Sequence, residues 1–350
     1  MLYFERADLN TMDWGKELET FPDHTVFQTP EWLEFLTSTQ NGEPVIAALK
    51  DSARTVGYFT GSIVRKFGLR ILGSPFVGWT TAYMGFNLRE GISRRDALHA
   101  LVRFAFRDLN CVHLELMDQK LRQEDVAGMN PRCRQFTGFE VDLTQSEQTL
   151  LRNMGDNCRW CLGKAKKCGV VIEEAQDMQF ADDYHAQLTD VFERQQLIPT
   201  YGIERVRALI RHILPTGMLL LLRARNPEGD CIATGIFLIK NDRMYFWGGP
   251  SWRKYHHLRP NEPLMWAAMQ YGKAHGARIL DLGGAGHYKK KYGGCPVAVP
   301  WLRISRFAIV PSLRDAAAEL FRTKQHLQGK LRAAFSSTLL WRDSHFFIRT

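Results

Sequence analysis

A duplication of one supersecondary unit is the feature of this sequence that most constrains its fold. The first copy has a strand, a helix with apolar residues along one face and a second strand, at Thr81–Phe86, Arg94–Asn110 and Cys111–Leu116. The second copy follows about 165 residues later along the chain. It has the same order of elements, at Met244–Gly248, Glu262–His275 and Arg278–Leu282. Because a strand–helix–strand crossover places its two strands parallel, we expect two similar α/β modules.

A pattern typical of antiparallel strands precedes each copy. Val45–Leu49 and Arg54–Arg65 flank a polar turn, and Leu219–Ala224 and Cys231–Lys240 flank another. The predicted fold class is therefore α/β, with two tandem modules that each have a mixed antiparallel and parallel sheet flanked by helices.

Helices between and after these units set the predicted domain boundaries. We place the N-terminal module at residues 1–145, the C-terminal module at residues 146–312 and a basic helical tail at residues 313–350. Helices are predicted at Ser146–Cys168, Phe180–Gln196, Ile203–Leu214 and Leu313–Phe335. The last of these either packs on the second module as a C-terminal helix or lies on the surface, where its basic residues would contact anionic lipid or a protein partner.

The composition is that of a soluble globular protein, with 45% hydrophobic and 24% charged residues among 350. We find no apolar run long enough to span a bilayer and no secretory signal at the N-terminus. Seven scattered cysteines indicate a reducing compartment, so the expected location is cytoplasmic. The net charge of +9 either favours anionic partners such as phosphates, RNA or a membrane surface, or serves solubility alone.

Four segments resemble a known family when they are taken together and in order. They are FQTPEWLEFL at Phe27–Leu36, KAKKCGVVIEE at Lys164–Glu174, HHLRPNEPLMWAAMQYGKAHGA at His256–Ala277 and DLGGAGHYKKKYGG at Asp281–Gly294. The chain resembles the FemAB-like proteins, which include the BioF2-like acetyltransferases and the tRNA-dependent peptidoglycan aminoacyltransferases. This resemblance covers about residues 25 to 310. It implies a tandem GNAT fold and transfer of an acyl or aminoacyl group to an amine.

The segment LGGAGHYKKKYGG carries most of the candidate site. The resemblance places Lys289 near the RNA end of the donor and the reacting ester. Lysine suits a phosphate or a developing oxyanion. Asp281, at the end of a buried strand, is a candidate base or orienting group, or a structural acceptor for the Gly-Gly turn; His287 is a second candidate base. If the segment is extended, Lys289 and Lys291 share one side.

Further binding candidates come from aromatic and polar side chains elsewhere in these segments. Two tyrosines beside the lysines would wall a pocket or stack on a base, and one aromatic residue of Met244–Gly248 would face the crevice. The candidates for binding substrate or donor are Tyr288, Lys291, Tyr292, Trp247, Arg259, Asn261, Gln28 and Trp32.

The loop before the second crossover helix bears on the donor. GNAT proteins that bind coenzyme A hold its pyrophosphate on a Gly-rich loop and a helix N-terminus. Here the loop is YHHLRPNEP, in which Pro260 and Pro263 lack N–H donors. Arg259 and Asn261 either contact an anion at the helix start, or Asn261 caps the helix.

Cys158 and Cys161 form a C-x-x-C pair inside the predicted basic helix. Cys168 is the one further cysteine nearby, so we expect small helix residues rather than a zinc or redox site, and no metal. The basic residues around the pair either contact RNA or a phosphorylated acceptor, or are a solvated helix face.

Three functions remain open from the sequence. The first is an N-acyltransferase that uses acyl-CoA as co-substrate to modify an amine of an amino sugar, a polysaccharide precursor or a peptide with anionic groups. The second is an aminoacyl-tRNA-dependent aminoacyltransferase with charged tRNA as partner. The third is a non-catalytic binding module in envelope polysaccharide biosynthesis.

Overall fold

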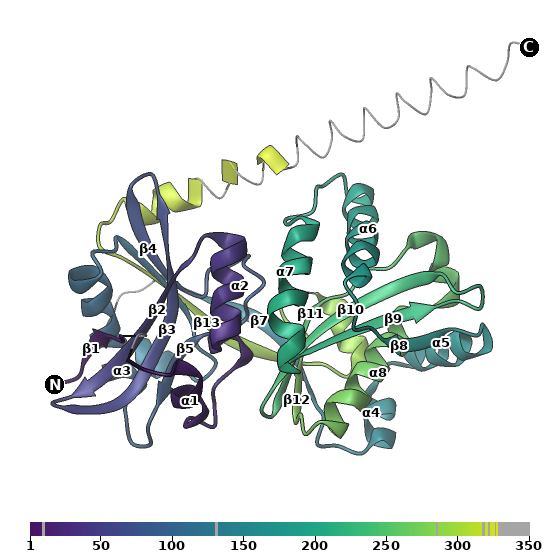
Figure 1. The fold of residues 1–350 in the computed structure, drawn as a ribbon, viewed down its shortest axis with the longest axis horizontal. Coiled ribbons are helices and arrows are strands. Elements are labelled where there is room, and N and C mark those ends of the chain that lie inside the picture. The colour runs from purple at the N-terminus through teal and green to yellow at the C-terminus, as the bar shows by residue number, and fades with distance from the viewer. Residues whose placement is uncertain are drawn as a thin grey trace, which may run out of the picture.

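One continuous sheet of thirteen strands crosses both halves of the molecule, in the order β1-β2-β3-β4-β6-β13-β7-β12-β11-β10-β9-β8, with β5 paired to β3 (Figure 1). The computed structural model describes residues 1–8, 11–129, 132–284, 286–316, 319–320, 323–325 and 327. The strands are β1 (Tyr3–Arg6), β2 (Glu43–Asp51), β3 (Arg54–Lys66), β4 (Leu69–Ser74), β5 (Gly85–Leu88), β6 (His113–Met117), β7 (Arg132–Asp142), β8 (Val171–Glu174), β9 (Leu219–Arg225), β10 (Cys231–Lys240), β11 (Arg243–Gly248), β12 (Ile279–Asp281) and β13 (Cys295–Ser305).

Helices cover both faces of this sheet. The α-helices are α1 (Trp14–Glu19), α2 (Pro30–Gln40), α3 (Arg94–Arg103), α4 (Glu147–Asn153), α5 (Asp156–Lys167), α6 (Gln179–Arg194), α7 (Ile203–Ile213) and α8 (Asn261–Ala274). The short helical turns are η1 (Val26–Gln28), η2 (Phe104–Asp108), η3 (Gln123–Val126), η4 (Leu214–Thr216), η5 (Arg253–Leu258) and η6 (His287–Tyr292).

The predicted tandem α/β architecture is confirmed, and the second crossover has the predicted form. β11 and β12 are parallel and joined through α8. The hairpins β2–β3 and β9–β10 are antiparallel, as their polar turns predict.

The first crossover differs from the prediction. Thr81–Phe86 was expected to be a strand parallel to Cys111–Leu116, but β6 pairs in parallel with β4, and β5 is antiparallel to β3. The prediction is wrong because residues 81–84 form no strand pairing. Gly85 has a φ of +79°, so the chain turns there before it enters β5.

The predicted helix Ser146–Cys168 is two helices, α4 and α5. Met154 has extended backbone angles, and the N–H of Gly155 donates to the carbonyl of Lys291 at 2.9 Å. This bond ties the start of α5 to the end of η6. The break therefore has a tertiary cause that helical periodicity does not reveal.

Two strands that the periodicity did not predict join the halves. β13 lies between β6 and β7 and is antiparallel to both, while β7 is antiparallel to β12. The C-terminal strand thus pairs with the last strand of the N-terminal crossover. Neither half completes its sheet alone.

The core is also continuous across the two halves. Helices α2 and α7 pack side by side (Figure 1), and Trp32, Phe35 and Leu209 lie in one buried cluster that draws on both halves. Near this cluster the side chain of Asn241 donates to the carbonyl of His24 at 2.8 Å. The relative placement of the halves is therefore fixed by apolar packing, hydrogen bonds and the shared sheet.

Within the described residues no helix is both long and apolar enough to cross a membrane. The predicted tail at 313–350 lies largely outside the described residues. Its beginning is attached to the sheet, where Nε of Arg314 donates to Oε1 of the buried Glu115 at 2.7 Å.

We predict that β13 is required for both halves to fold. A fragment of residues 1–294 should lose cooperative thermal unfolding, because β6 and β7 would each lose an antiparallel neighbour. A fragment of residues 1–316 keeps β13 and should unfold cooperatively. Circular dichroism of both fragments measures this, and a cooperative transition in the shorter one would contradict the prediction.

Candidate active site

A cavity of about 490 Å³ opens between the two halves, at the carboxyl ends of β11 and β12. The N-terminal half contributes Phe27, Val77, Gly78, Thr80, Thr81, Ala82, Tyr83 and Met117 to its lining. The C-terminal half contributes Tyr245–Gly249, Asp281–Gly284, Tyr288 and Lys289, and Phe136 and Val299 come from β7 and β13.

The cavity exists because two parallel strands separate. The pairing of β11 with β12 ends at Tyr245 and Asp281. Beyond this point Phe246 pairs with β10, while Leu282 donates its N–H to the carbonyl of Phe139 on β7 at 2.8 Å. Each strand keeps its outer neighbour, so a gap opens between their ends, where ligands of open α/β sheets bind.

Asp281 lies at the base of this gap and is 1% exposed. Its Oδ1 accepts the N–H of Gly283 at 2.6 Å, which confirms the structural role in the Gly-Gly turn. Its Oδ2 has no hydrogen bond of standard geometry among the described residues. Burial raises the pKa of Asp281 to about 6, and the hydrogen bond from the N–H of Gly283 opposes that rise. A carboxyl group that titrates near neutrality is suited to proton transfer.

Lys289 lies on η6 and is 8% exposed. Its Nζ donates to the carbonyl of Gly284 and reaches the cavity, and burial lowers its pKa. The nearby Asp281 carboxylate opposes this decrease. An ammonium group and a carboxyl group therefore share one small, partly buried space.

The expected extended conformation of the lysine triplet is wrong. The three lysines lie on the short helix η6, so Lys289 and Lys291 do not share a side. Nζ of Lys291 pairs with Oε1 of Glu262 at 2.8 Å, and Lys290 is exposed. Lys289 alone of the triplet lines the cavity.

The aromatic candidates divide between cavity and core. Tyr288 lines the cavity and is 57% exposed, whereas Tyr292 is buried in the core of the second half. Trp247 lines the cavity, and its Nε1 has no hydrogen-bond partner among the described residues. His287 is exposed and is not part of the lining.

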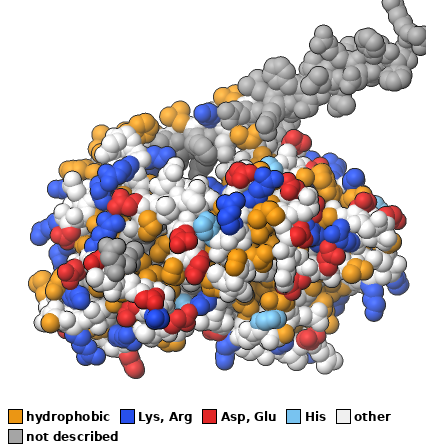
Figure 2. Space-filling view, viewed as in Figure 1, with side chains coloured by type: hydrophobic (Ala, Val, Ile, Leu, Met, Phe, Trp, Pro, Cys, Tyr) orange, Lys and Arg blue, Asp and Glu red, His pale blue; other side chains and the backbone are white. Residues whose placement is uncertain are grey.

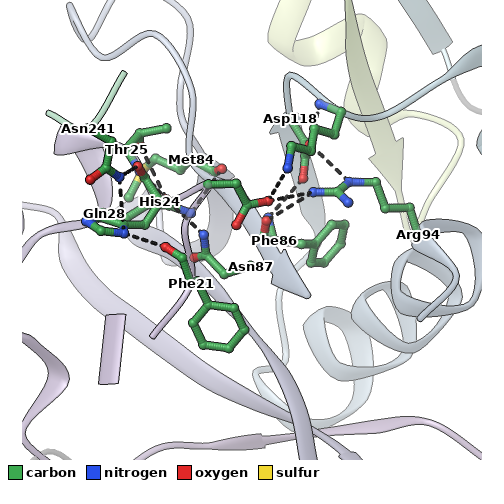
Figure 3. Close-up of polar contacts among 12 residues, drawn as sticks. Phe21, His24, Thr25, Gln28, Met84, Phe86, Asn87, Arg94, Asp118 and Asn241 are labelled. Atoms are coloured by element: carbon green, nitrogen blue, oxygen red, sulfur yellow. Dashed lines mark hydrogen bonds and ion pairs between the residues drawn. The ribbon is translucent and has the colours of Figure 1, made fainter. Parts of the chain in front are cut away.

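Gln28 and Trp32 lie behind the cavity wall rather than in it. The Gln28 amide donates to the carbonyl of Met84 at 3.2 Å and accepts the N–H of Thr25 at 2.9 Å (Figure 3). Nε1 of Trp32 donates to Oγ1 of Thr81 at 3.2 Å. Both residues are fully buried, so they support the segment 81–84 and do not contact substrate.

A second buried group holds the other end of this segment. Oδ2 of Asp118 accepts the N–H of Phe86 at 3.0 Å, and its Oδ1 accepts from Nε of Arg94 at 3.3 Å (Figure 3). The strand β5 therefore begins at a fixed place relative to the cavity wall.

The start of α8 is already occupied by side chains of the protein. The predicted cap is wrong, because Asn261 is the first helical residue and Pro260, at the N-cap, makes no side-chain cap bond. Glu262 lies in the first turn, is paired with Lys291, and is followed by Pro263, which has no N–H. Arg259 lies over the ring of Trp160, 5.5 Å from its centroid. A carboxylate thus takes the place at the helix N-terminus that favours an anion.

The C-x-x-C pair lies within the helix α5. Cys158 and Cys161 are free and buried on the inner face of α5, and burial raises the pKa of Cys158 to about 12. Within the described residues no group of three or more His, Cys, Asp or Glu side chains is arranged to hold a metal ion.

The sequence analysis did not identify Tyr83, a buried phenol in the cavity lining, and it expected one aromatic residue of β11 at the cavity where Tyr245, Phe246 and Trp247 all line it. Tyr83 lies in the segment that was expected to be a strand, and the cavity brings it together with Asp281 from the other half of the chain. No local pattern signals such proximity. Tyr245 was one of three aromatic candidates on its strand, and alternation alone did not choose among them.

Comparisons with known proteins agree with this architecture. Residues 152–291 match the acetyltransferase (GNAT) domain family. A stretch of 66 residues is 30% identical to the lipid II:glycine glycyltransferase of Staphylococcus saprophyticus, which is 19% of this chain and 16% of that protein. The chain therefore spans only a small part of the length of this curated relative.

Solved structures show the same fold over most of the chain. FemX has a TM-score of 0.66 at 12% identity and covers 85% of this chain and 96% of its own. L-PGS from Bacillus licheniformis has a TM-score of 0.52 at 12% identity over 84% and 97% of the two chains. A tandem GNAT protein from the clavulanic acid pathway has a TM-score of 0.51 at 12% identity over 87% and 98%.

The class of protein is thus a tandem GNAT fold, as the resemblance to FemAB-like proteins implies. More particularly, residues 152–291 are similar to the acetyltransferase (GNAT) domain family.

We predict that Asp281 makes the protein less stable as the pH rises. Its folded-state pKa of about 6 lies above the ordinary value of 3.8. At a pH between these two values, Asp281 therefore holds a proton in the folded state that it has lost in the unfolded state. The stabilisation is fully present below about pH 4 and is lost as the pH rises through 6, by about 3 kcal/mol in the free energy of unfolding.

Asp281→Asn removes this titration. Its free energy of unfolding should therefore fall less than that of the wild type between pH 4 and pH 7, as urea denaturation at both values measures. An equal fall in the two proteins would contradict the assignment.

Proposed function

We propose that this protein transfers an acyl group from an activated ester to an amine, at the cavity between its two halves. The observation that carries the proposal is the presence of both Asp281 and Lys289 in the cavity where β11 and β12 separate. Among the described residues that line this cavity, no side chains form a nucleophile–base pair of the serine or cysteine type, so direct attack by the amine is the simplest route.

The geometry supports one sequence of events. The carboxylate of Asp281 takes a proton from the ammonium form of the acceptor, and the free amine attacks the carbonyl carbon of the donor. The ammonium group of Lys289 stabilises the oxyanion that forms. The new C–N bond remains, the ester C–O bond breaks, and the leaving oxygen takes up the proton. Positioning of the two reactants supplies much of the rate enhancement.

The start of α8 favours an aminoacyl ester on tRNA over acyl-CoA as donor. Glu262 and Lys291 neutralise each other there, and Pro263 lacks an N–H, so a pyrophosphate would meet a carboxylate and too few donors. The lipid II:glycine glycyltransferase likeness and the FemX fold are in keeping with this choice. An amine of a glycan or peptide precursor is the corresponding acceptor.

A basic helix next to the site supports an RNA-bound donor. Lys164, Lys166 and Lys167 on α5 form no ion pairs among the described residues, and the backbone of α5 is bonded to η6. Elsewhere the charges are less segregated: on the face shown in Figure 2, basic and acidic side chains are interspersed. The three lysines of α5 lie in the last turn of this helix, at the end away from η6, so they would attract RNA phosphates at a distance from the reacting end.

Acyl-CoA remains the second candidate donor because residues 152–291 match an acetyltransferase family. We expect a mixture of aminoacyl-tRNAs to raise the melting temperature of the protein by a few degrees at low salt and acetyl-CoA to have no effect. The shift should diminish steeply as salt increases. Stabilisation by acetyl-CoA or longer acyl-CoAs, without an effect of tRNA, would reverse the choice.

We predict that Lys289→Ala lowers kcat by about 10²- to 10³-fold, because one donor to the oxyanion is lost. Lys290→Ala is the matched control, since Lys290 is the adjacent lysine and is exposed. Single-turnover transfer from a radiolabelled donor measures both variants. Equal activity of Lys289→Ala and wild type would favour the non-catalytic binding module.

A further inference from the structure

One titratable side chain of the N-terminal half reaches the cavity, and it is Tyr83. It is buried at 6% exposure. Its hydroxyl and the carbonyl of Gly283 each lie 3.8 Å from the point that a Cβ on Gly138 would occupy. The N–H of Gly283 is bonded to Oδ1 of Asp281, while the buried Oδ2 has no partner among the described residues, so this oxygen is an open acceptor in the cavity that the phenol lines.

The protein holds Tyr83 from behind with several buried contacts. Its carbonyl accepts from Oγ1 of Thr25 at 3.3 Å, and the amide of Gln28 holds the next residue, Met84. Trp32 holds Thr81 at the other end of the segment. The N-terminal half therefore presents one phenol at a fixed place and supports it with residues that do not enter the cavity.

The protonation state of Tyr83 follows from its surroundings. Burial and the Asp281 carboxylate both raise the pKa of this phenol, so it keeps its proton at neutral pH. A phenol that keeps its proton donates a hydrogen bond best when Asp281 is ionised. The other charged or titratable groups that act on Asp281 or adjoin it in the cavity are Glu140 on β7, Arg243 and Tyr245 on β11, and Lys289 on η6.

We propose that Tyr83 is a positioning residue for the reaction, which donates a hydrogen bond to Asp281 and keeps that carboxylate available as the base. Gln28 and Trp32 act through Tyr83, because they fix the segment that carries it. The role of Tyr83 in catalysis rests on the proposed function. The hydrogen bond itself is independent of which donor and acceptor the enzyme uses.

Tyr83→Phe tests the proposal because it removes one hydroxyl group and keeps the ring. Without this donor the ionised form of Asp281 is less stable relative to its protonated form, so its pKa rises. The acidic limb of the pH–rate profile should therefore move to higher pH by about one pH unit. Activity should fall about fivefold at pH 6 and recover above pH 8. A purely structural role would lower activity by the same factor at every pH. Tyr58→Phe, a buried tyrosine outside the cavity, should leave the profile unchanged.

A measurement without substrate separates this inference from the proposed function. The titration of Asp281 is followed by ¹³C NMR of carboxyl-labelled aspartate, and Asp281→Asn assigns its signal. Tyr83→Phe should move the Asp281 midpoint upward, and Gln28→Met should move it in the same direction by a smaller amount. An unchanged midpoint in Tyr83→Phe overturns the inference even if the enzyme transfers acyl groups. A shifted midpoint supports it even if every donor tried is inactive.

Discussion

The pairing of β13 with both β6 and β7 is the interaction on which the rest of the structure depends. It joins two sheets into one and fixes the angle between the halves, so that residues far apart in the sequence line a common cavity. The helix pair α2–α7 reinforces this arrangement from one face. Hydrogen bonds between strands are individually modest in net free energy, but a ladder along an eleven-residue strand specifies register strongly. The position of Val299 in the cavity wall follows from that register.

The cavity brings together groups that would be costly to bury alone. An isolated carboxylate or ammonium in an apolar interior loses most of its hydration, and its pKa moves toward the neutral form. Asp281 and Lys289 both show this tendency, and each is moderated by the other's charge or by hydrogen bonds. The result is a carboxyl group with a raised pKa and an ammonium group with a lowered pKa in one cavity.

The sequence predicted where helices and strands occur better than it predicted which of them pair or pack together. Periodicity located α3, α8 and the hairpins, because each depends on local alternation or on one apolar helix face. It failed for residues 81–84 and for the break at Gly155, since tertiary hydrogen bonds decide both. Lys289 and Asp281 were found because they lie within one short segment. Tyr83 was not found, because its significance comes from a residue nearly two hundred positions away.

The late position of β13 in the chain has a consequence for the order of events during synthesis. A ribosome releases the N-terminal residues first, and domains usually fold as they emerge. Here β6 must wait for residues 301–305 before its neighbour exists, and long-range pairing of this kind is slow. The exposed edge of β6 is open to incorrect partners throughout that interval. The cavity between the two halves is therefore incomplete until β13 has been synthesised.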